Sequence, residues 1–285
     1  MMTMSIVHLG PDICSCTSIF QGKRLKKLSR YHRLDNYLLT LSRRNRIRVS
    51  SEHTCLEVQG VSYRVPGTQH NLLNRVSFSL PEKSLGLIYG RSGSGKTTLL
   101  QVLSGLAKPT AGSICLKKKR LDGQSNESEE ILSASKVGLV FQFPERYFLA
   151  DTVAGELTFG FKKRLEDQFF MQQFRMRLES AILAVGLNGI ALDLDPRSLS
   201  DGFKRRLALA VQLVRMPDIL LLDEPLAGLD WKARADVVKL LENLKKDIML
   251  IVVSHDLKEI SRLVDKAWRM EMGGFLIEEP LSISN

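Results

Sequence analysis

Four short apolar runs recur along the chain, and polar residues follow each of them. The runs and the residues that follow are 85–89 with Gly90, 137–141 with Gln142, 219–222 with Asp223, and 248–253 with Ser254. Unbroken apolar runs of this length are typical of strands buried on both faces, as in a parallel sheet. Ligands of such sheets bind beyond the carboxyl ends of the strands. The pattern therefore predicts an α/β protein in which four strand ends meet at one site.

Other hydrophobic patterns predict the parts around that sheet. Between positions 56 and 80, short β-rich runs alternate with turn residues, which indicates an antiparallel β-subdomain. Apolar residues recur at spacings of three and four from Phe170 to Val185 and stop at Gly186, which predicts an amphipathic helix. A further helix opens with Lys204, Arg205 and Arg206, and we expect these three side chains on its solvated face.

The first polar loop has the spacing of a phosphate-binding loop. Glycines let backbone N–H groups wrap phosphates, and the helix expected over 97–106 offers its positive N-terminus. We expect Lys96 to reach the β- and γ-phosphates and Thr97 to bind Mg²⁺. A glycine-rich turn without a nucleotide is the weaker interpretation, because a strand-like run precedes the loop. The residues expected at the phosphates are Gly90, Arg91, Ser92, Gly93, Ser94, Gly95, Lys96, Thr97 and Thr98.

The other strand ends carry side chains suited to nucleotide hydrolysis. Asp223 can hold Mg²⁺ or its water shell, and Glu224 can orient the attacking water. His255 can bond the γ-phosphate, and Gln142 is a weaker candidate. Taken singly, Asp223 could be a helix N-cap, His255 a structural residue and Gln142 a loop residue. Together with the phosphate loop they predict an ATPase.

In this order the motifs resemble those of the ATP-binding subunits of ABC transporters. The matching segments are the P-loop 90–97, the Q-loop residue Gln142, the signature 199–203, the pair Asp223 and Glu224, the D-loop 227–230 and the switch histidine His255. The resemblance implies a P-loop NTPase fold with a parallel core sheet, an N-terminal antiparallel β-subdomain and a helical subdomain at about 145–205.

The resemblance also implies a mechanism that needs two subunits. ATP and Mg²⁺ would lie between the P-loop of one subunit and Ser200 and Gly202 of the other. Lys96, Glu224 and His255 would be the catalytic residues, and Thr97, Asp223 and Gln142 would face the metal. The second ATPase could be another copy or a different chain.

Two further segments, 137–145 and 204–208, resemble the cobalt-type and energy-coupling-factor ATPases of bacteria. Those ATPases power import of metal ions or vitamins through a separate integral membrane subunit. By resemblance, the residues expected to be exposed and to contact such a subunit are Phe143, Arg146, Tyr147 and Phe148. Most of the positive charge of the chain lies in residues 1–50 and not in the part that resembles an ATPase. We therefore do not expect nucleic acid as a partner.

Three positions depart from the family pattern. Asp201 replaces a signature glycine and Phe203 replaces the signature glutamine. A carboxylate near a polyphosphate is unfavourable by Coulomb repulsion. In one interpretation, which we slightly favour, the chain works in a heterodimer and its own signature acts only weakly on ATP. In the other, Asp201 points away from the nucleotide. Val65 stands where the family often has an aromatic residue that stacks on adenine, and Tyr63 is the alternative.

Residues 1–50 contain ten Lys or Arg and two Asp, so they carry +8 of the formal net charge of +10. A basic, Ser-containing, acid-poor segment is typical of an organelle transit peptide, expected to be disordered and cleaved near 49–51. A basic tail that binds acidic surfaces is the alternative. With the resemblance to plastid-targeted ABC proteins of plants, the segment implies a chloroplast protein, peripheral on the stromal side of the inner envelope. A mitochondrial location is the second choice.

The leading hypothesis is an ATPase domain over 51–285 that energises movement of a small solute or metal ion across the plastid envelope. No apolar run is long enough to span a bilayer, so the channel must belong to a partner. A soluble ABC ATPase of the iron–sulfur assembly type and a non-hydrolysing regulatory subunit remain alternatives. The four cysteines indicate neither a zinc site nor a disulfide framework.

Overall fold

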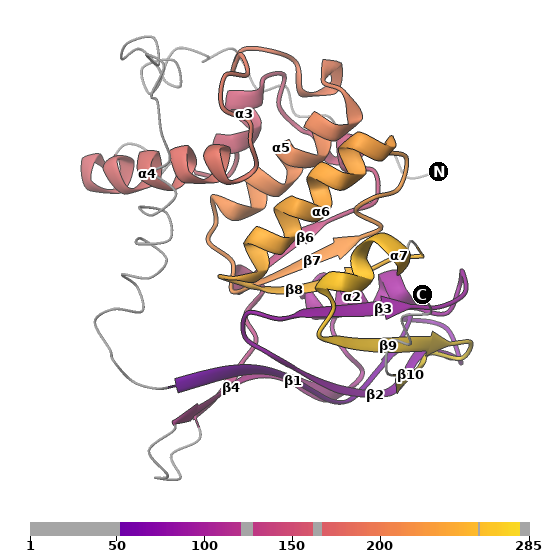
Figure 1. Ribbon diagram of the computed structural model, residues 1–285. Helices are drawn as coiled ribbons and strands as arrows, with labels where there is room; N and C mark the ends of the chain where they lie inside the picture. Colours follow the sequence, from indigo (N-terminus) through magenta and orange to yellow (C-terminus); the bar gives the residue numbers. More distant parts are fainter. Residues whose placement is uncertain (1–51, 121–127, 162–166, 256, 280–285) are drawn as a thin grey trace.

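Two sheets organise the computed structural model, which describes residues 52–120, 128–161, 167–255 and 257–279 (Figure 1). The predicted transit peptide lies outside the described residues. The six-stranded core sheet has the order β10-β9-β3-β8-β7-β6, and the second sheet has the order β2-β1-β4-β5. Neighbouring strands are parallel from β9 to β6, and β10 is antiparallel to β9. The predicted α/β class with a parallel core sheet is therefore confirmed.

The four apolar runs form four of the parallel strands. These strands and the rest of the core sheet are β3 (Leu85–Tyr89), β6 (Val137–Val140), β7 (Ile219–Asp223), β8 (Met249–Val253), β9 (Lys266–Glu271) and β10 (Phe275–Glu278). Every residue of β7 and β8 is buried. Alternate residues of a strand point to opposite faces, so Leu220 and Leu222 enter one hydrophobic core while Ile219 and Leu221 enter the other. Two-sided burial explains why these strands read as unbroken apolar runs.

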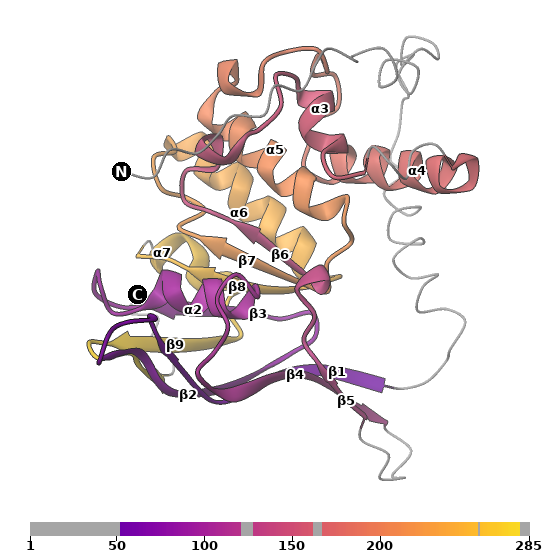
Figure 2. The same cartoon turned by 180° about the vertical axis from the view of Figure 1, so that it is seen from behind.

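The second sheet is antiparallel throughout and covers one face of the core sheet together with helix α2 (Figure 2). Its strands are β1 (Glu52–Arg64), β2 (Asn71–Pro81), β4 (Ala111–Arg120) and β5 (Ser128–Ile131). The helix, α2 (Lys96–Leu103), is shorter than the predicted 97–106. Gly105 has φ 79°, a left-handed conformation that ends an α-helix.

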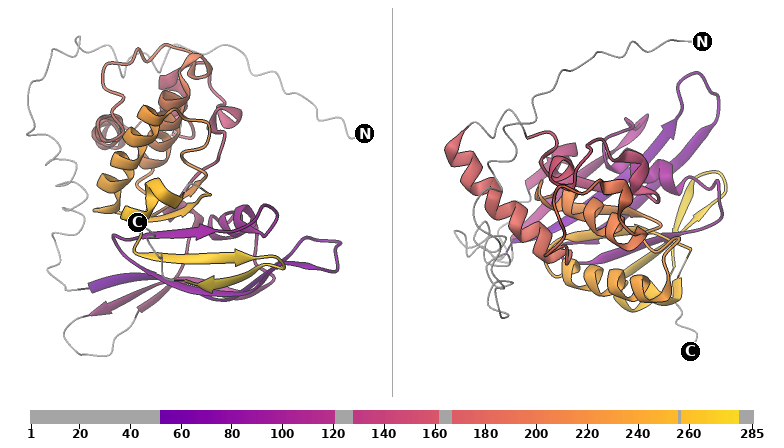
Figure 3. Two further views of the ribbon diagram at one scale, coloured as in Figure 1. Left: turned by 45° about the vertical axis from the view of Figure 1, so that its right-hand side comes forward. Right: turned by 90° about the horizontal axis from the view of Figure 1, so that it is seen from above.

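Helices cover the other face of the core sheet and extend away from it (Figure 3). They are α3 (Val153–Thr158), α4 (Gln168–Ala184), α5 (Asp201–Leu213), α6 (Trp231–Lys245) and α7 (Leu257–Ile260), with the short 3₁₀ turns η3 (Pro144–Tyr147), η5 (Pro196–Ser198) and η6 (Ser261–Leu263). A further short turn, η2 (Ala134–Lys136), lies beside Gly105 at the end of α2. The predicted apolar stripe of α4 is buried at Phe170, Phe174, Leu178 and Ala181. The proposed helical subdomain at about 145–205 contains η3, α3, α4, η5 and the start of α5. No helix in the described part of the chain combines the length and apolar character that a bilayer span needs.

Candidate active site

The ends of three neighbouring strands bring the predicted residues together. Asp223 at the end of β7 pairs with Val253 of β8, and Val253 also pairs with Ile88 of β3. Beyond the strands, the N–H of Glu224 donates to the carbonyl oxygen of Val253 (2.8 Å), and the N–H of Ser254 donates to that of Ile88 (3.2 Å). Three segments therefore lie side by side: the loop after β3, the pair Asp223 and Glu224 at the end of β7, and the pair Ser254 and His255 after β8.

The loop after β3 has a conformation that only glycine accommodates. Gly90, Gly93 and Gly95 have φ of 149°, 79° and 107°, in the region that side chains disfavour. A Cβ at Gly90 would clash with the carbonyl oxygen of Met270, and one at Gly95 would lie 2.9 Å from that of Leu72. The glycines thus let the loop turn tightly between β9 and β2. The loop then leads into the N-terminus of α2, where unpaired N–H groups favour an anion.

Lys96 is folded back over this loop. Its Nζ donates to the carbonyl oxygens of Gly90 (2.8 Å) and Arg91 (2.9 Å). Burial lowers the pKa of the Lys96 ammonium, and the carboxylates of Glu224 and Asp223 partly oppose that shift. The ammonium is therefore held at the phosphate loop, facing the two acidic groups.

Thr97 and Asp223 form the pair of oxygens that suits a magnesium ion. Thr97 Oγ1 donates to Asp223 Oδ2 at 3.0 Å. Burial raises the pKa of Asp223, while the Thr97 hydrogen bond and the charges of Lys96 and His255 lower it. Within the described residues, no cluster of three His, Cys, Asp or Glu side chains could hold a metal. A hydroxyl and one carboxylate fit Mg²⁺, which usually keeps several waters and takes further oxygens from phosphates.

Glu224 is oriented by its neighbours and has one acceptor atom to spare. Its Oε2 accepts from Ser254 Oγ and from the N–H of His255, both at 3.2 Å. Its Oε1 is buried and accepts no hydrogen bond within the described residues, and Nε2 of His255 lies 3.4 Å from it. Glu224 has φ 47°, a strained backbone for a non-glycine residue. An oriented carboxylate with an unused oxygen is what positioning a water requires.

Comparison with known proteins now decides the family. Residues 73–227 match the family model described as ABC transporter. Over 231 residues the chain is 58% identical to the Arabidopsis thaliana protein "ABC transporter I family member 11, chloroplastic", with 81% of this chain and 83% of that protein covered. This chain belongs to the family of ABC transporter ATP-binding subunits. It is an ABC ATPase.

Bacterial relatives and solved structures agree with this assignment. The chain is 36% identical over 223 residues to the energy-coupling factor transporter ATP-binding protein EcfA2 of Acetivibrio thermocellus, with 76% and 77% of the two chains covered. It superposes with a TM-score of 0.64 and 25% identity on cbiO1 of Clostridium perfringens, part of the ABC transporter complex cbiONQ, covering 78% and 86% of the chains. A nucleotide-free ATP-binding cassette from an ABC transporter, 20% identical with a TM-score of 0.63 over 79% and 90%, shares the fold.

The predicted signature lies at the start of α5, and the principal contacts of this helix do not include α2, the helix that follows the P-loop. Ser200 precedes α5 and Gly202 lies in its first turn, beside Ala233 of α6. The principal contacts of α5 are with α3, α4, α6, β6 and the turns η3 and η5. Asp201 is 72% exposed, and its Oδ1 lies 3.1 Å from Nζ of Lys204, which partly neutralises its charge. Gln142 follows β6, the strand next to β7, and is half-buried.

Two expectations about side-chain exposure are wrong. Arg205, expected on a solvated face, is 4% exposed and donates to backbone carbonyl groups beside the site. Its spacing of three and four from the buried Ala208 and Leu209 was the signal that could have revealed this. Phe148, expected to be exposed, lies in the hydrophobic core, whereas Phe143 and Tyr147 are exposed as expected. Ser254, which orients Glu224, was not predicted as a site residue.

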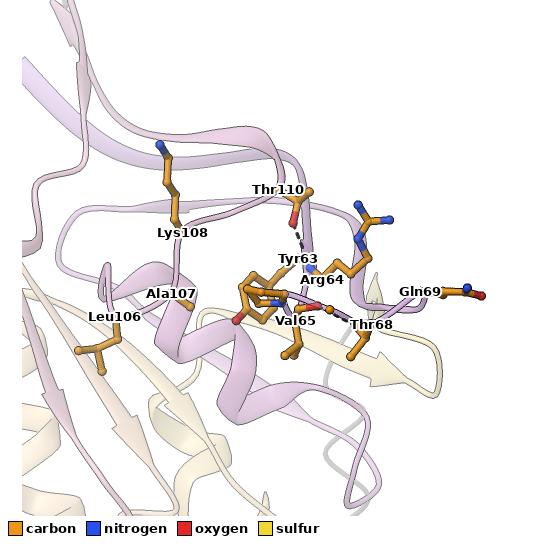
Figure 4. Close-up of a pocket in the computed structure, with 11 residues that line it drawn as sticks. Tyr63, Arg64, Val65, Thr68, Gln69, Leu106, Ala107, Lys108 and Thr110 are labelled. Carbon is orange, nitrogen blue, oxygen red and sulfur yellow. Dashed lines mark hydrogen bonds between the residues drawn. The ribbon is translucent and has the colours of Figure 1, made fainter. Parts of the chain in front are cut away.

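A cavity of about 710 Å³ lies where β1 ends and the loop to β2 begins (Figure 4). It is lined by residues 63–69 and by residues of the segment 106–110. Both adenine candidates, Tyr63 and Val65, line it. Tyr63 also packs against the core cluster beneath the second sheet, and Val65 is exposed. Of the two candidates, Tyr63 therefore has the planar ring but is partly buried against the core, and Val65 offers an exposed aliphatic side chain.

Proposed function

We propose that this chain hydrolyses ATP to energise movement of a small solute or metal ion across the chloroplast inner envelope, as a peripheral subunit on the stromal side. The hydrogen bond between Thr97 and Asp223, set beside the unused oxygen of Glu224, carries the proposal of hydrolysis. The plastid location is supported by the chloroplastic relative and by the basic character of residues 1–50. The bacterial relatives support the role in transport.

The residues have distinct roles in the proposed reaction. The loop from Gly90 to Thr98 holds the phosphates of ATP, with Lys96 at the β- and γ-phosphates. Thr97 and Asp223, with Gln142, would hold Mg²⁺, and the ion would supply positive charge to the phosphate oxygens. Glu224 orients the attacking water and accepts its proton, and His255 contacts the γ-phosphate.

The signature requires a second ATPase subunit in this proposal. Ser200 and Gly202 offer a helix N-terminus, and an anion binds well there. Since they lie apart from the P-loop of the same chain, they act on ATP held by the partner. Asp201 and Phe203 make this half the weaker one, which favours a heterodimer in which the partner supplies the stronger signature. The exposed Phe143, Arg146 and Tyr147 face the integral membrane subunit.

Two other functions are distinguishable from this one. A soluble ABC ATPase of the iron–sulfur assembly type would have no membrane partner. A non-hydrolysing regulatory subunit would bind Mg-ATP without needing the carboxylate of Glu224. The retained network around Glu224 favours hydrolysis.

Affinity purification from intact chloroplasts tests the proposal. We expect the tagged chain to bring down an integral membrane protein and a second ABC ATPase, and the purified complex to release phosphate from ATP. The same complex with Glu224→Gln should bind ATP but not turn it over. Recovery of a complex without any integral membrane protein would refute the transport function, and unchanged turnover of the variant would refute hydrolysis by this chain.

A further inference from the structure

Among the residues that the structure describes, Arg205 makes three hydrogen bonds, all to backbone carbonyl oxygens of loops at the candidate active site. Its Nη1 donates to Phe141 (3.1 Å) and Gln142 (2.6 Å), and its Nη2 donates to Ala227 (3.2 Å). The first two carbonyl groups belong to the Q-loop, and the third belongs to the D-loop. Arg205 itself lies on α5, the helix that begins at the signature. One side chain therefore joins three segments that are far apart in the sequence.

Packing alone does not account for an arginine at this position. Only 4% of its surface is exposed, and its Nε is buried without a hydrogen-bond partner within the described residues. Burial disfavours a guanidinium cation, and an apolar side chain of similar volume is often at least as stabilising. What an arginine adds is a rigid fork of donors that fixes several acceptors relative to one another.

The D-loop contact leads directly to Glu224. The N–H of Ala227 donates to the carbonyl oxygen of Glu224 at 3.1 Å, closing the turn that follows β7. Glu224 starts this turn with φ 47°. Because a displaced turn changes the backbone of Glu224, the direction of its carboxylate depends on where Ala227 is held. Arg205 thus links the backbone of Gln142 to the backbone of Glu224 through two hydrogen bonds and the intervening turn.

We propose that Arg205 is a positioning residue that makes the Q-loop and the D-loop move as one unit, so that Gln142 and Glu224 reach bound ATP together. The proposal rests on the proposed roles of those two residues in hydrolysis. It predicts that a change at Arg205 affects turnover rather than nucleotide affinity. It also predicts that a signal arriving at the Q-loop from a partner reaches Glu224 without passing through the nucleotide.

The test compares Arg205→Lys with Arg206→Lys in the full chain within its purified complex. A lysine keeps the charge, but its single ammonium cannot hold three carbonyl groups in a fixed arrangement. Arg206 is the matched control because it lies on the same helix and also binds a carbonyl group, that of Val185 (3.1 Å), together with Asp236 (2.8 Å). We expect Arg205→Lys to lower kcat at least about tenfold with KM for ATP within about twofold. Arg206→Lys should leave both within about twofold.

A second measurement needs no turnover and distinguishes positioning from general stability. Amide hydrogen exchange is followed at 141–147 and 225–230 while Mg²⁺ and a non-hydrolysable ATP analogue are added. In the unaltered chain both segments should gain protection over the same range of analogue concentration. In Arg205→Lys the two segments should respond separately, and in Arg206→Lys they should still respond together.

Three results would overturn the proposal: an unchanged kcat, an effect on KM alone, or linked protection of both loops in Arg205→Lys. Equal losses in the two variants would mean that a shared loss of helix stability is responsible, and this also rejects it. Failure of the unaltered chain to bind the analogue would instead reject the proposed function itself. The two failures are therefore separable.

Discussion

The P-loop half of the site and the signature half differ in how firmly the structure holds them. Lys96, Asp223 and Glu224 are each less than a tenth exposed, and hydrogen bonds tie all three to neighbouring groups. Asp201 and Phe203 of the signature are exposed at the start of α5. The buried residues come together within one chain, whereas in our proposal the exposed half acts on ATP held by a second chain. The departures from the family pattern at the signature lie in the half that a partner can supplement.

The largest expected effect is at the firmly held half. Glu224→Gln should lower kcat by about a thousandfold, because loss of a general base typically removes 10²–10⁴-fold of rate. The amide keeps the shape of the side chain, so ATP binding should persist. Phosphate release and binding of a fluorescent ATP analogue measure the two quantities. A loss of binding in parallel with kcat would show that Glu224 holds the site together instead.

The next effect concerns the metal. Thr97→Val removes the hydroxyl beside Asp223 without changing the shape of the side chain much, so the Mg²⁺ concentration for half-maximal turnover should rise about tenfold. Titration of Mg²⁺ at saturating ATP measures this. Thr98→Val, in the same phosphate loop, is the comparison for the Mg²⁺ requirement, because the hydroxyl that donates to Asp223 is that of Thr97. An equal rise in both variants would contradict the assignment of Thr97.

Substitutions at the signature should change turnover less, and the two single variants should change it in opposite directions. Asp201→Gly removes a screened negative charge and should raise turnover by about threefold or less. Lys204→Met removes the ion-pair partner of Asp201 and should lower turnover by a similar factor. The double variant should return close to Asp201→Gly, because the lysine then has no carboxylate to neutralise. Steady-state phosphate release from the assembled complex measures the set. Opposite signs would mean that Asp201 supports catalysis.

The smallest expected effect is on thermal stability. Its pH dependence should distinguish the buried carboxylate of Asp223 from the exposed carboxylate of Asp201. Burial raises the pKa of Asp223 above its ordinary value of 3.8, so the folded chain binds this proton more readily than the unfolded chain. Its contribution to stability therefore falls as pH rises from about 4 through the raised pKa. Without nucleotide and Mg²⁺, Asp223→Asn should match the unaltered Tm near pH 4 and exceed it by a few degrees at neutral pH. Thermal unfolding measured across this pH range checks the difference. Asp201→Asn should show no such rise.

Much of the site could be predicted because its chemistry is local in sequence. Gly90, Lys96 and Thr97 lie in one loop, and Asp223 directly follows four aliphatic residues. Two-sided burial makes each parallel strand recognisable, and the strand ends then identify the site. The expected ABC fold and ATPase activity followed from these motifs. The chloroplastic relative agrees with the plastid prediction, which was drawn from the basic residues 1–50 together with the family resemblance.

Arg205 and Phe148 show where such reasoning ends. Arg205 stands in a basic triplet that suggested solvent exposure, yet the Q-loop and the D-loop meet over it. Phe148 follows the exposed Tyr147 by one residue but packs into the core beneath the helices. The partners of Arg205 lie 22 or more residues away in the sequence, and Phe148 lies beside residues of α5 as well as nearer ones, so neither environment is specified by adjacent residues alone.

The sequence by itself determined which residues can bind phosphate and metal, since strand burial and loop spacing are properties of short segments. Only the tertiary structure decided the strand order that places β3 between β9 and β8, the left-handed backbone of Glu224 and the orientation of its carboxylate by Ser254. These features depend on pairing between distant segments. Local propensity does not specify which distant segments pair. Their pairing becomes favourable only when the whole sheet forms.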